Sequence, residues 1–273
     1  MVKSIDRETR GPGILFVVVV LLIVGVVAAR LLGWNPLGGQ GQEGNLPQIG
    51  DLGGAVGGSD TGTGGDTGGS LPAAVPTVII YHTYASQNYS PNEAYTTQGR
   101  PGEIVEVGAE LARQLEARGI RAIHLQNVND WPSHAEAYKV AASVVEQKIR
   151  ATPNVVAVID VHRDGLSGKP DGYTTGLINN ESAAKILLVV GDLDNPELDS
   201  NVAFAEQVRA GLNRMYPDLS RGIKIQPINR NGHLHPQHLT AVIGDYTDNN
   251  LEEAKRGAAA LAAVLAEALR GQA

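Results

Sequence analysis

The chain has 273 residues, a formal net charge of −7 and no cysteine. The acidic balance argues against nucleic-acid binding, which needs a basic surface. Without cysteine there is no disulfide, no thiolate nucleophile and no thiolate metal site, so a metal would have to be held by histidines and carboxylates, which suits zinc.

The N-terminal part predicts a membrane anchor. Residues 1–12 form a short tail with three basic side chains, and residues 13–34 are almost entirely apolar apart from Arg30. A stretch of roughly 20 apolar residues spans a bilayer, and Trp34 suits the far interface. A cleaved signal peptide is the alternative, but the apolar stretch is longer than is usual for one. The positive flank predicts a single-pass protein of the cell membrane whose C-terminal domain lies outside the cytoplasm.

Residues 35–76 are rich in glycine and predict a flexible linker. Such a composition cannot bury an apolar core. At this length its root-mean-square span is on the order of 35 Å, enough to let a domain work away from the membrane surface. The stretch contains no Gly-Lys-Ser or Gly-Lys-Thr, so it is not a phosphate-binding loop.

Residues 77–273 predict a single α/β domain with a mainly parallel sheet flanked by helices. We expect strands near residues 77–81, 119–124, 154–162, 173–178, 185–191, 222–228 and 239–244. Helical spacing of apolar residues predicts a helix that ends at Gly119, one opened by Pro132, one capped by Ser200 and one that starts near Leu251.

Charged side chains follow the central strand. The apolar run from residue 154 to 159 leads into Asp160, His162, Arg163 and Asp164, and the first strand leads into His82. Because parallel strands end at one edge of a sheet, the two histidines are candidates for a shared zinc site completed by a carboxylate. Structural histidines and a loop held by charged groups are the alternative.

Several segments occur in the order found in one family. From about Val78 to Leu269 the chain resembles the stage II sporulation protein P family, and the matching segments are Ile80–Thr83, Val105–Gly108, His124–Ser133, Val158–Gly165, Val189–Gly191, Asn201–Ala205, Tyr216–Ile223 and Leu251–Arg256. The resemblance implies a zinc-dependent N-acetylmuramoyl-L-alanine amidase fold, with amidase and endopeptidase action on peptidoglycan during endospore engulfment. It also implies stage II sporulation protein D as a partner and His82 and His162 as metal ligands.

The chain departs from the family pattern at acidic positions. The family's first motif usually reads His-Thr-His-x-x-Glu, whereas this chain has Tyr84 and Gln87 at the last two defined positions, and its last strand lacks the usual Glu. A glutamine amide cannot act as a base. Candidate substitutes are Glu93, Glu103 and Asp245, with Asp245 the nearest to the lost position and therefore the candidate catalytic residue.

Further site candidates are Arg163, Asp164 and Arg221, which fall in matching motifs without an assigned role. The cluster of His233, His235 and His238 is a weaker metal candidate, and His124 and His134 are expected to be structural or exposed. Two functions remain: a peptidoglycan hydrolase, or a catalytically degenerate module that binds the wall or a partner protein.

Overall fold

A computed structural model of the chain describes residues 75–270. The predicted anchor lies outside these residues, as does the predicted linker except for its last two positions. In the described part of the chain, no helix combines the length and apolar character that crossing a membrane requires.

Strands and helices alternate along the chain. The strands are β1 (Thr77–Tyr81), β2 (Arg121–His124), β3 (Val155–Asp164), β4 (Thr175–Ile178), β5 (Glu181–Ala184), β6 (Ile186–Gly191), β7 (Ser220–Gln226) and β8 (His238–Asp245). The helices are α2 (Ile104–Glu116), α3 (Ala137–Arg150), α4 (Leu198–Met215) and α5 (Leu251–Ala268), with 3-10 turns η1 (His134–Glu136) and η2 (Gly232–Leu234).

Six strands form one sheet in the order β2-β1-β3-β8-β6-β7. The first four are mutually parallel, and β6 and β7 are parallel to each other but antiparallel to β8. Strands β4 and β5 form a separate antiparallel hairpin. The predicted α/β class with a mainly parallel sheet is therefore confirmed.

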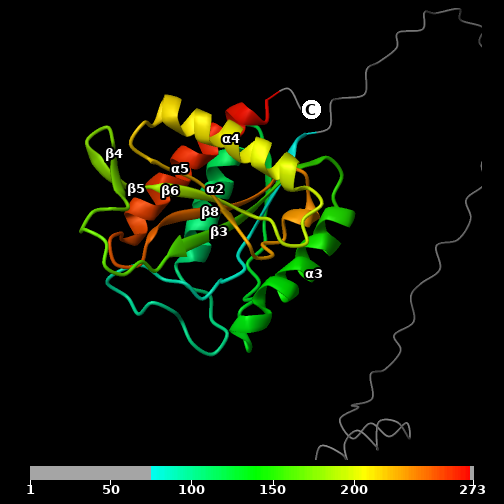
Figure 1. The fold of residues 1–273 in the computed structure, drawn as a ribbon, viewed down its shortest axis with the longest axis horizontal. Helices are drawn as coiled ribbons and strands as arrows, with labels where there is room; N and C mark the ends of the chain where they lie inside the picture. Colours follow the sequence, from blue (N-terminus) through cyan, green and yellow to red (C-terminus); the bar gives the residue numbers. More distant parts are fainter. Residues whose placement is uncertain (1–74, 271–273) are drawn as a thin grey trace, which may run out of the picture. The chain divides into compact units, whose positions relative to one another are not determined.

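Helices cover both faces of the sheet (Figure 1). Helices α2, α4 and α5 pack on one face over a large apolar core that includes Ile80 and Val161, whereas α3 packs on the other face over a smaller core that includes Tyr81 and Val158. Successive residues of a strand point to opposite faces of the sheet. The core that a strand residue joins therefore shows on which face the residues before and after it lie.

Two predicted helix starts are wrong. Pro132 does not open α3, because the chain passes through an irregular segment and η1 before the helix begins at Ala137. Ser200 does not cap α4, because that helix already begins at Leu198 and its N-cap residue is Glu197. The start of α5 at Leu251 is confirmed, and Asn250 caps it through a reciprocal pair of hydrogen bonds with Glu253.

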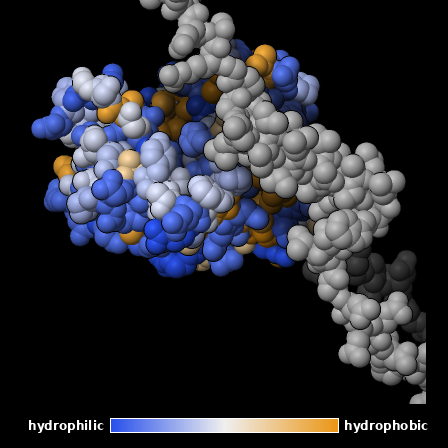
Figure 2. All heavy atoms as spheres, turned by 90° about the horizontal axis from the view of Figure 1, so that it is seen from below, coloured by the Kyte–Doolittle hydropathy of each residue, from blue (hydrophilic) through white to orange (hydrophobic). Residues whose placement is uncertain are grey.

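The sheet ends irregularly where β3 meets β8. Between His162 and Asp164 the register shifts, because β8 has one more residue here than β3. Gly244 takes a left-handed conformation at this bulge, with φ of 67°, which costs glycine little. Figure 2 shows a largely hydrophilic surface on the face in view, with scattered hydrophobic residues between the polar ones.

Helix α5 approaches β5 so closely that Gly257 has no room for a side chain. A Cβ there would lie 2.6 Å from the backbone oxygen of Ala184. We predict that Gly257→Ala lowers the melting temperature, although alanine gains up to about 1 kcal/mol of helix propensity. Gly211→Ala is the matched control, because its Cβ would meet a Val264 methyl group that can move. A thermal melt in which Gly257→Ala is the more stable of the two variants would contradict this packing.

Candidate functional site

His82 follows β1 and lies on the α2 side of the sheet. Its imidazole is fully buried and so close to the helix that a Cβ on Gly108 would lie 2.5 Å from His82 Nε2. Both ring nitrogens have partners: Nδ1 lies 3.1 Å from the carbonyl oxygen of Val161, and Nε2 lies 2.9 Å from His124 Nε2. Since a carbonyl only accepts, Nδ1 carries the proton, and Nε2 accepts the hydrogen bond that His124 donates.

This arrangement keeps His82 neutral. Burial, together with the neighbouring His124, lowers the pKa of His82 to about 3, and burial lowers the pKa of His124 to about 4. Protonating His82 would place a second N–H donor opposite the one that His124 already donates, in an apolar setting. His82 is therefore a hydrogen-bonded core residue that links the end of β1 to β2 and β3 and packs against α2.

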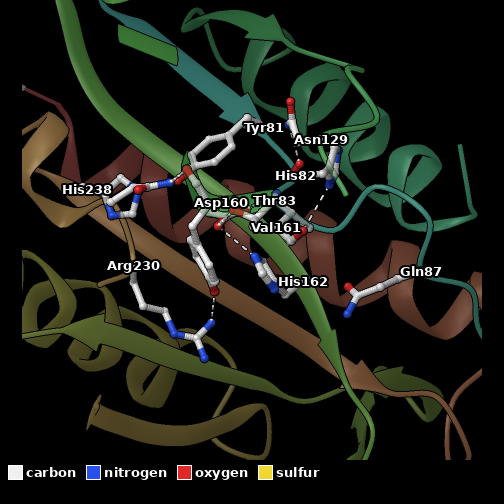
Figure 3. A network of polar contacts seen from close by, with 12 residues as sticks. Tyr81, His82, Thr83, Gln87, Asn129, Asp160, Val161, His162, Arg230 and His238 are labelled. Atoms are coloured by element: carbon white, nitrogen blue, oxygen red, sulfur yellow. Dashed lines mark hydrogen bonds and ion pairs between the residues drawn. The ribbon is translucent and has the colours of Figure 1, made fainter. Parts of the chain in front are cut away.

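His162 lies on β3 and contacts a buried carboxylate. His162 Nε2 is 2.7 Å from Asp160 Oδ2, and both side chains are almost completely shielded from solvent. Asp160 also accepts hydrogen bonds from the backbone nitrogen and the hydroxyl group of Thr83, at 2.9 and 2.7 Å (Figure 3). Burial alone would raise the pKa of Asp160, but His162 and Thr83 outweigh it and hold the pKa below its usual value.

Aromatic rings surround His162. Tyr84 packs edge-on against the imidazole with ring centroids 5.4 Å apart, and Tyr138 of α3 lies parallel to it at 6.4 Å. Tyr84 itself stacks on His134 at 4.2 Å, and the Tyr138 hydroxyl accepts a hydrogen bond from Arg230 Nη1 at 2.6 Å. Because Nε2 faces Asp160, Nδ1 is the nitrogen of His162 that a ligand would have to use.

The predicted metal pair is not brought together. His82 contacts α2 on one face of the sheet, whereas His162 contacts Tyr138 of α3 on the other. Their positions follow from the strand alternation that places Ile80 and Tyr81 in different cores. Within residues 75–270, no three His, Asp or Glu side chains are grouped closely enough to hold a metal ion. The residues present therefore do not fit a zinc ion shared by His82 and His162.

Gln87 serves a loop contact instead of a catalytic one. Its amide nitrogen donates to the backbone oxygen of Arg163 at 3.3 Å, and its amide oxygen accepts from the backbone nitrogen of Arg163 at 3.1 Å. This pairing uses the donor and the acceptor of an amide together, which a glutamate carboxylate lacks. Gln87 thus joins the loop after β1 to β3.

Arg163 is likewise committed to the backbone. Its guanidinium donates to the carbonyl oxygens of Asn88, Ala94 and Asp164 and lies 4.7 Å from the ring centroid of Tyr95. A guanidinium has five N–H groups in a fixed fork, so it can hold several loop carbonyls at once. Arg163 therefore shapes the loop between β1 and α2.

The carboxylate candidates also have structural partners. Asp245, 1% exposed, accepts hydrogen bonds from the backbone nitrogens of Leu166 and Thr247 and from the Thr247 hydroxyl. Glu103 accepts from the backbone of Tyr89 and the side chain of Asn92. Asp164 Oδ2 lies 2.8 Å from Arg221 Nη1, and the side chain of Glu93 is exposed.

The histidine cluster before β8 contributes to the core. His238 is buried and its Nε2 lies 2.9 Å from the Tyr81 hydroxyl, while His235 Nε2 lies 3.2 Å from the carbonyl oxygen of Val155. Burial lowers the pKa of His238 to about 4. His233 is exposed, so the three rings do not converge on one point.

The sequence interpretation missed the partners of His162. Asp160 lies two residues earlier on the same strand face, and that period-two spacing was a usable signal. Thr83 and Tyr138 come from a turn and from a helix, and nothing in the local sequence indicates that they meet beside His162.

Buried neutral histidines should make the domain sensitive to acid. In an unfolded chain a histidine has a pKa of about 6.5, whereas His82, His124 and His238 have lowered values in the fold. As the pH falls below about 6.5, the unfolded state takes up protons first, so stability is lost toward pH 4. We predict a lower urea midpoint at pH 5 than at pH 7.5.

The same experiment has an internal control. His238→Gln should flatten the pH dependence because it removes one buried group, whereas His233→Gln, at an exposed position, should leave the slope unchanged. Equal slopes in both variants and the parent chain would show that buried histidine does not determine the acid response.

Asp245 should matter for stability. In Asp245→Asn, one carboxylate oxygen becomes an amide N–H₂ group that faces a backbone or hydroxyl donor. The loss of a buried acceptor should cost about 1–3 kcal/mol of unfolding free energy, measured by denaturant titration. The exposed Glu93→Gln is the matched control. If the denaturation midpoint of Asp245→Asn is unchanged, Asp245 does not hold the loops in place.

Comparisons with known proteins give the family. The sequence matches the family of stage II sporulation protein P (SpoIIP) over residues 45–266. It is 28% identical over 207 residues to "Stage II sporulation protein P" of Bacillus subtilis (strain 168), a match that covers 70% of this chain and 50% of the relative. The chain thus spans about half the length of this curated relative.

Solved structures of low identity resemble the fold. The CwlD amidase from Clostridioides difficile, solved in complex with the GerS lipoprotein, is 10% identical with a TM-score of 0.48, covering 71% of this chain and 98% of that chain. The N-acetylmuramoyl-L-alanine amidase AmiC2 of Nostoc punctiforme is 16% identical with a TM-score of 0.43, and the match covers 71% of this chain and 94% of that chain. Since the family match takes in well over half of the sequence, this chain belongs to the stage II sporulation protein P family.

Proposed function

We propose that this chain is a peptidoglycan hydrolase of the sporulating cell, tethered to the membrane by residues 13–34 and acting on amide bonds of the wall. The family membership carries this proposal. The anchor, the linker and a partnership with stage II sporulation protein D, predicted from the sequence and the resemblance, belong to the same proposal.

The acid–base pair that the described site offers is Asp160 and His162. The carboxylate lies 2.7 Å from Nε2 of the imidazole, which leaves Nδ1 as the nitrogen that would accept a proton from a reacting group. Tyr84 and Tyr138 keep the ring in place. Because the residues do not fit a zinc ion shared by His82 and His162, no catalytic step is assigned to a metal.

A second candidate function is binding without cleavage, and the site geometry favours it. The two histidines face different sides of the sheet, His162 is only 4% exposed, and the position of the usual family glutamate holds Gln87. A domain of this kind would recognise the wall or a partner protein while another enzyme cuts the bond.

Release of free stem peptides from purified peptidoglycan distinguishes hydrolysis from binding without cleavage. A hydrolase should release peptides, resolved by chromatography, and His162→Gln should reduce the rate at least about a hundredfold, the usual contribution of a general base. His233→Gln, at an exposed histidine on η2, is the control for a general loss of activity.

Each outcome decides something. Co-sedimentation with peptidoglycan and no release of peptides would favour the binding function. If peptide release stops when a chelator is added, the proposal that Asp160 and His162 act without a metal ion is contradicted. If the chain neither releases peptides nor sediments with peptidoglycan, the proposal that it acts on peptidoglycan is overturned.

A further inference from the structure

A groove lies beside the candidate site, between the segment after β2 and α3. Its volume is about 540 Å³, within the range of sites that hold small ligands. Four apolar side chains form much of its lining: Trp131, Pro132, Val140 and Val144. Trp131 is 54% exposed and Val140 is 42% exposed, so a large apolar surface faces solvent here.

The indole at one end of this groove is held in place. A Cβ on Gly99 would lie 2.8 Å from Trp131 Cδ1, so the loop between β1 and α2 packs directly against the ring. An exposed aromatic side chain that is already fixed loses little conformational entropy when it binds a ligand. The ring is therefore a preformed apolar platform.

Asn129 connects the lining of the groove to the turn after β1. Its amide nitrogen donates to the carbonyl oxygen of His82 at 2.8 Å, which fixes the side chain next to the candidate site. Its side-chain oxygen is buried and has no hydrogen-bond partner among residues 75–270. Because that oxygen is shielded from solvent, the hydroxyl groups of Ser133 and Ser143, which also line the groove and are not buried, are the ones that a ligand can reach.

The charges on the rim cancel. Glu136 and Lys139 form an ion pair at 3.5 Å, and the other polar lining residues, Asn129, Ser133 and Ser143, are neutral. A rim without excess charge does not favour a polyanion or a strongly charged peptide. It suits a neutral ligand with an apolar face and several hydrogen-bonding groups.

We propose that this groove is a saccharide subsite that binds the N-acetylated glycan strand of peptidoglycan, with one sugar ring stacked on Trp131. The C–H face of a pyranose ring matches the indole and the valines, and an acetamido or hydroxyl group of the sugar forms a hydrogen bond with Ser133 or Ser143. The inference rests on the proposed function, which it extends by naming the part of the wall that is recognised.

Intrinsic fluorescence gives a direct test, because the chain has two tryptophans, Trp34 and Trp131. In the full chain carrying Trp34→Phe, adding a soluble oligomer of N-acetylglucosamine should shift the emission of Trp131 in a saturable way. Trp131→Ala should weaken binding of the oligomer about tenfold, because both the aromatic contact and the area that the ring buries are lost. Trp131→Phe should retain most of the affinity. Leu193→Ala, at an exposed apolar side chain outside the groove, should change nothing.

Sedimentation with whole peptidoglycan distinguishes the two proposals. If the parent chain binds peptidoglycan but Trp131→Ala binds equally well and the emission does not move, the groove proposal is overturned and the proposed function stands. If the parent chain binds neither ligand, both fail. A shift that depends on protein concentration and not on the saccharide would assign the groove to a second copy of the chain and overturn the subsite.

Discussion

The buried carboxylate of Asp160 is the interaction on which the candidate site depends. It accepts two hydrogen bonds from Thr83 and faces His162, so it fixes both the turn that follows β1 and the imidazole on β3. A charged carboxylate in the core is tolerated only when its oxygens are paired in this way. The loop after the turn is then held by Gln87 and Arg163. This loop packs against Trp131 at Gly99 and carries Tyr84, whose ring contacts His162.

Strand geometry explains why the two histidines do not form the shared metal site that the family resemblance implies. Side chains alternate along a strand, so two histidines that end neighbouring parallel strands share a face only if their positions match in register. Tyr81 is paired with Asp160, which places His82 level with Val161 and one residue out of step with His162. His82 therefore completes the core under α2, and His162 contacts Tyr84 and Tyr138.

The fold was largely predictable, and the site was not. The continuous β-branched run of β3 and the helical spacing of apolar residues in α5 are local sequence patterns, and such patterns predict buried strands and helices. The start of α3 was missed because Pro132 is a common first-turn residue that here belongs to an irregular segment. The two histidines were correctly placed at strand ends, but their faces depend on register between strands, which local sequence does not encode. The roles of Asp245 and Arg163 depend on loop backbones that meet only in the folded chain.

The central claim is that His82 and His162 do not share a metal ion, and metal stoichiometry tests it most directly. The purified full chain would be dialysed against zinc at neutral pH and its bound zinc counted for the parent, His82→Ala and His162→Ala. We expect that His82 and His162 hold no zinc ion in common, so that the two substitutions do not remove the same bound ion. One zinc per chain in the parent, lost in both variants while each remains folded by circular dichroism, would contradict it.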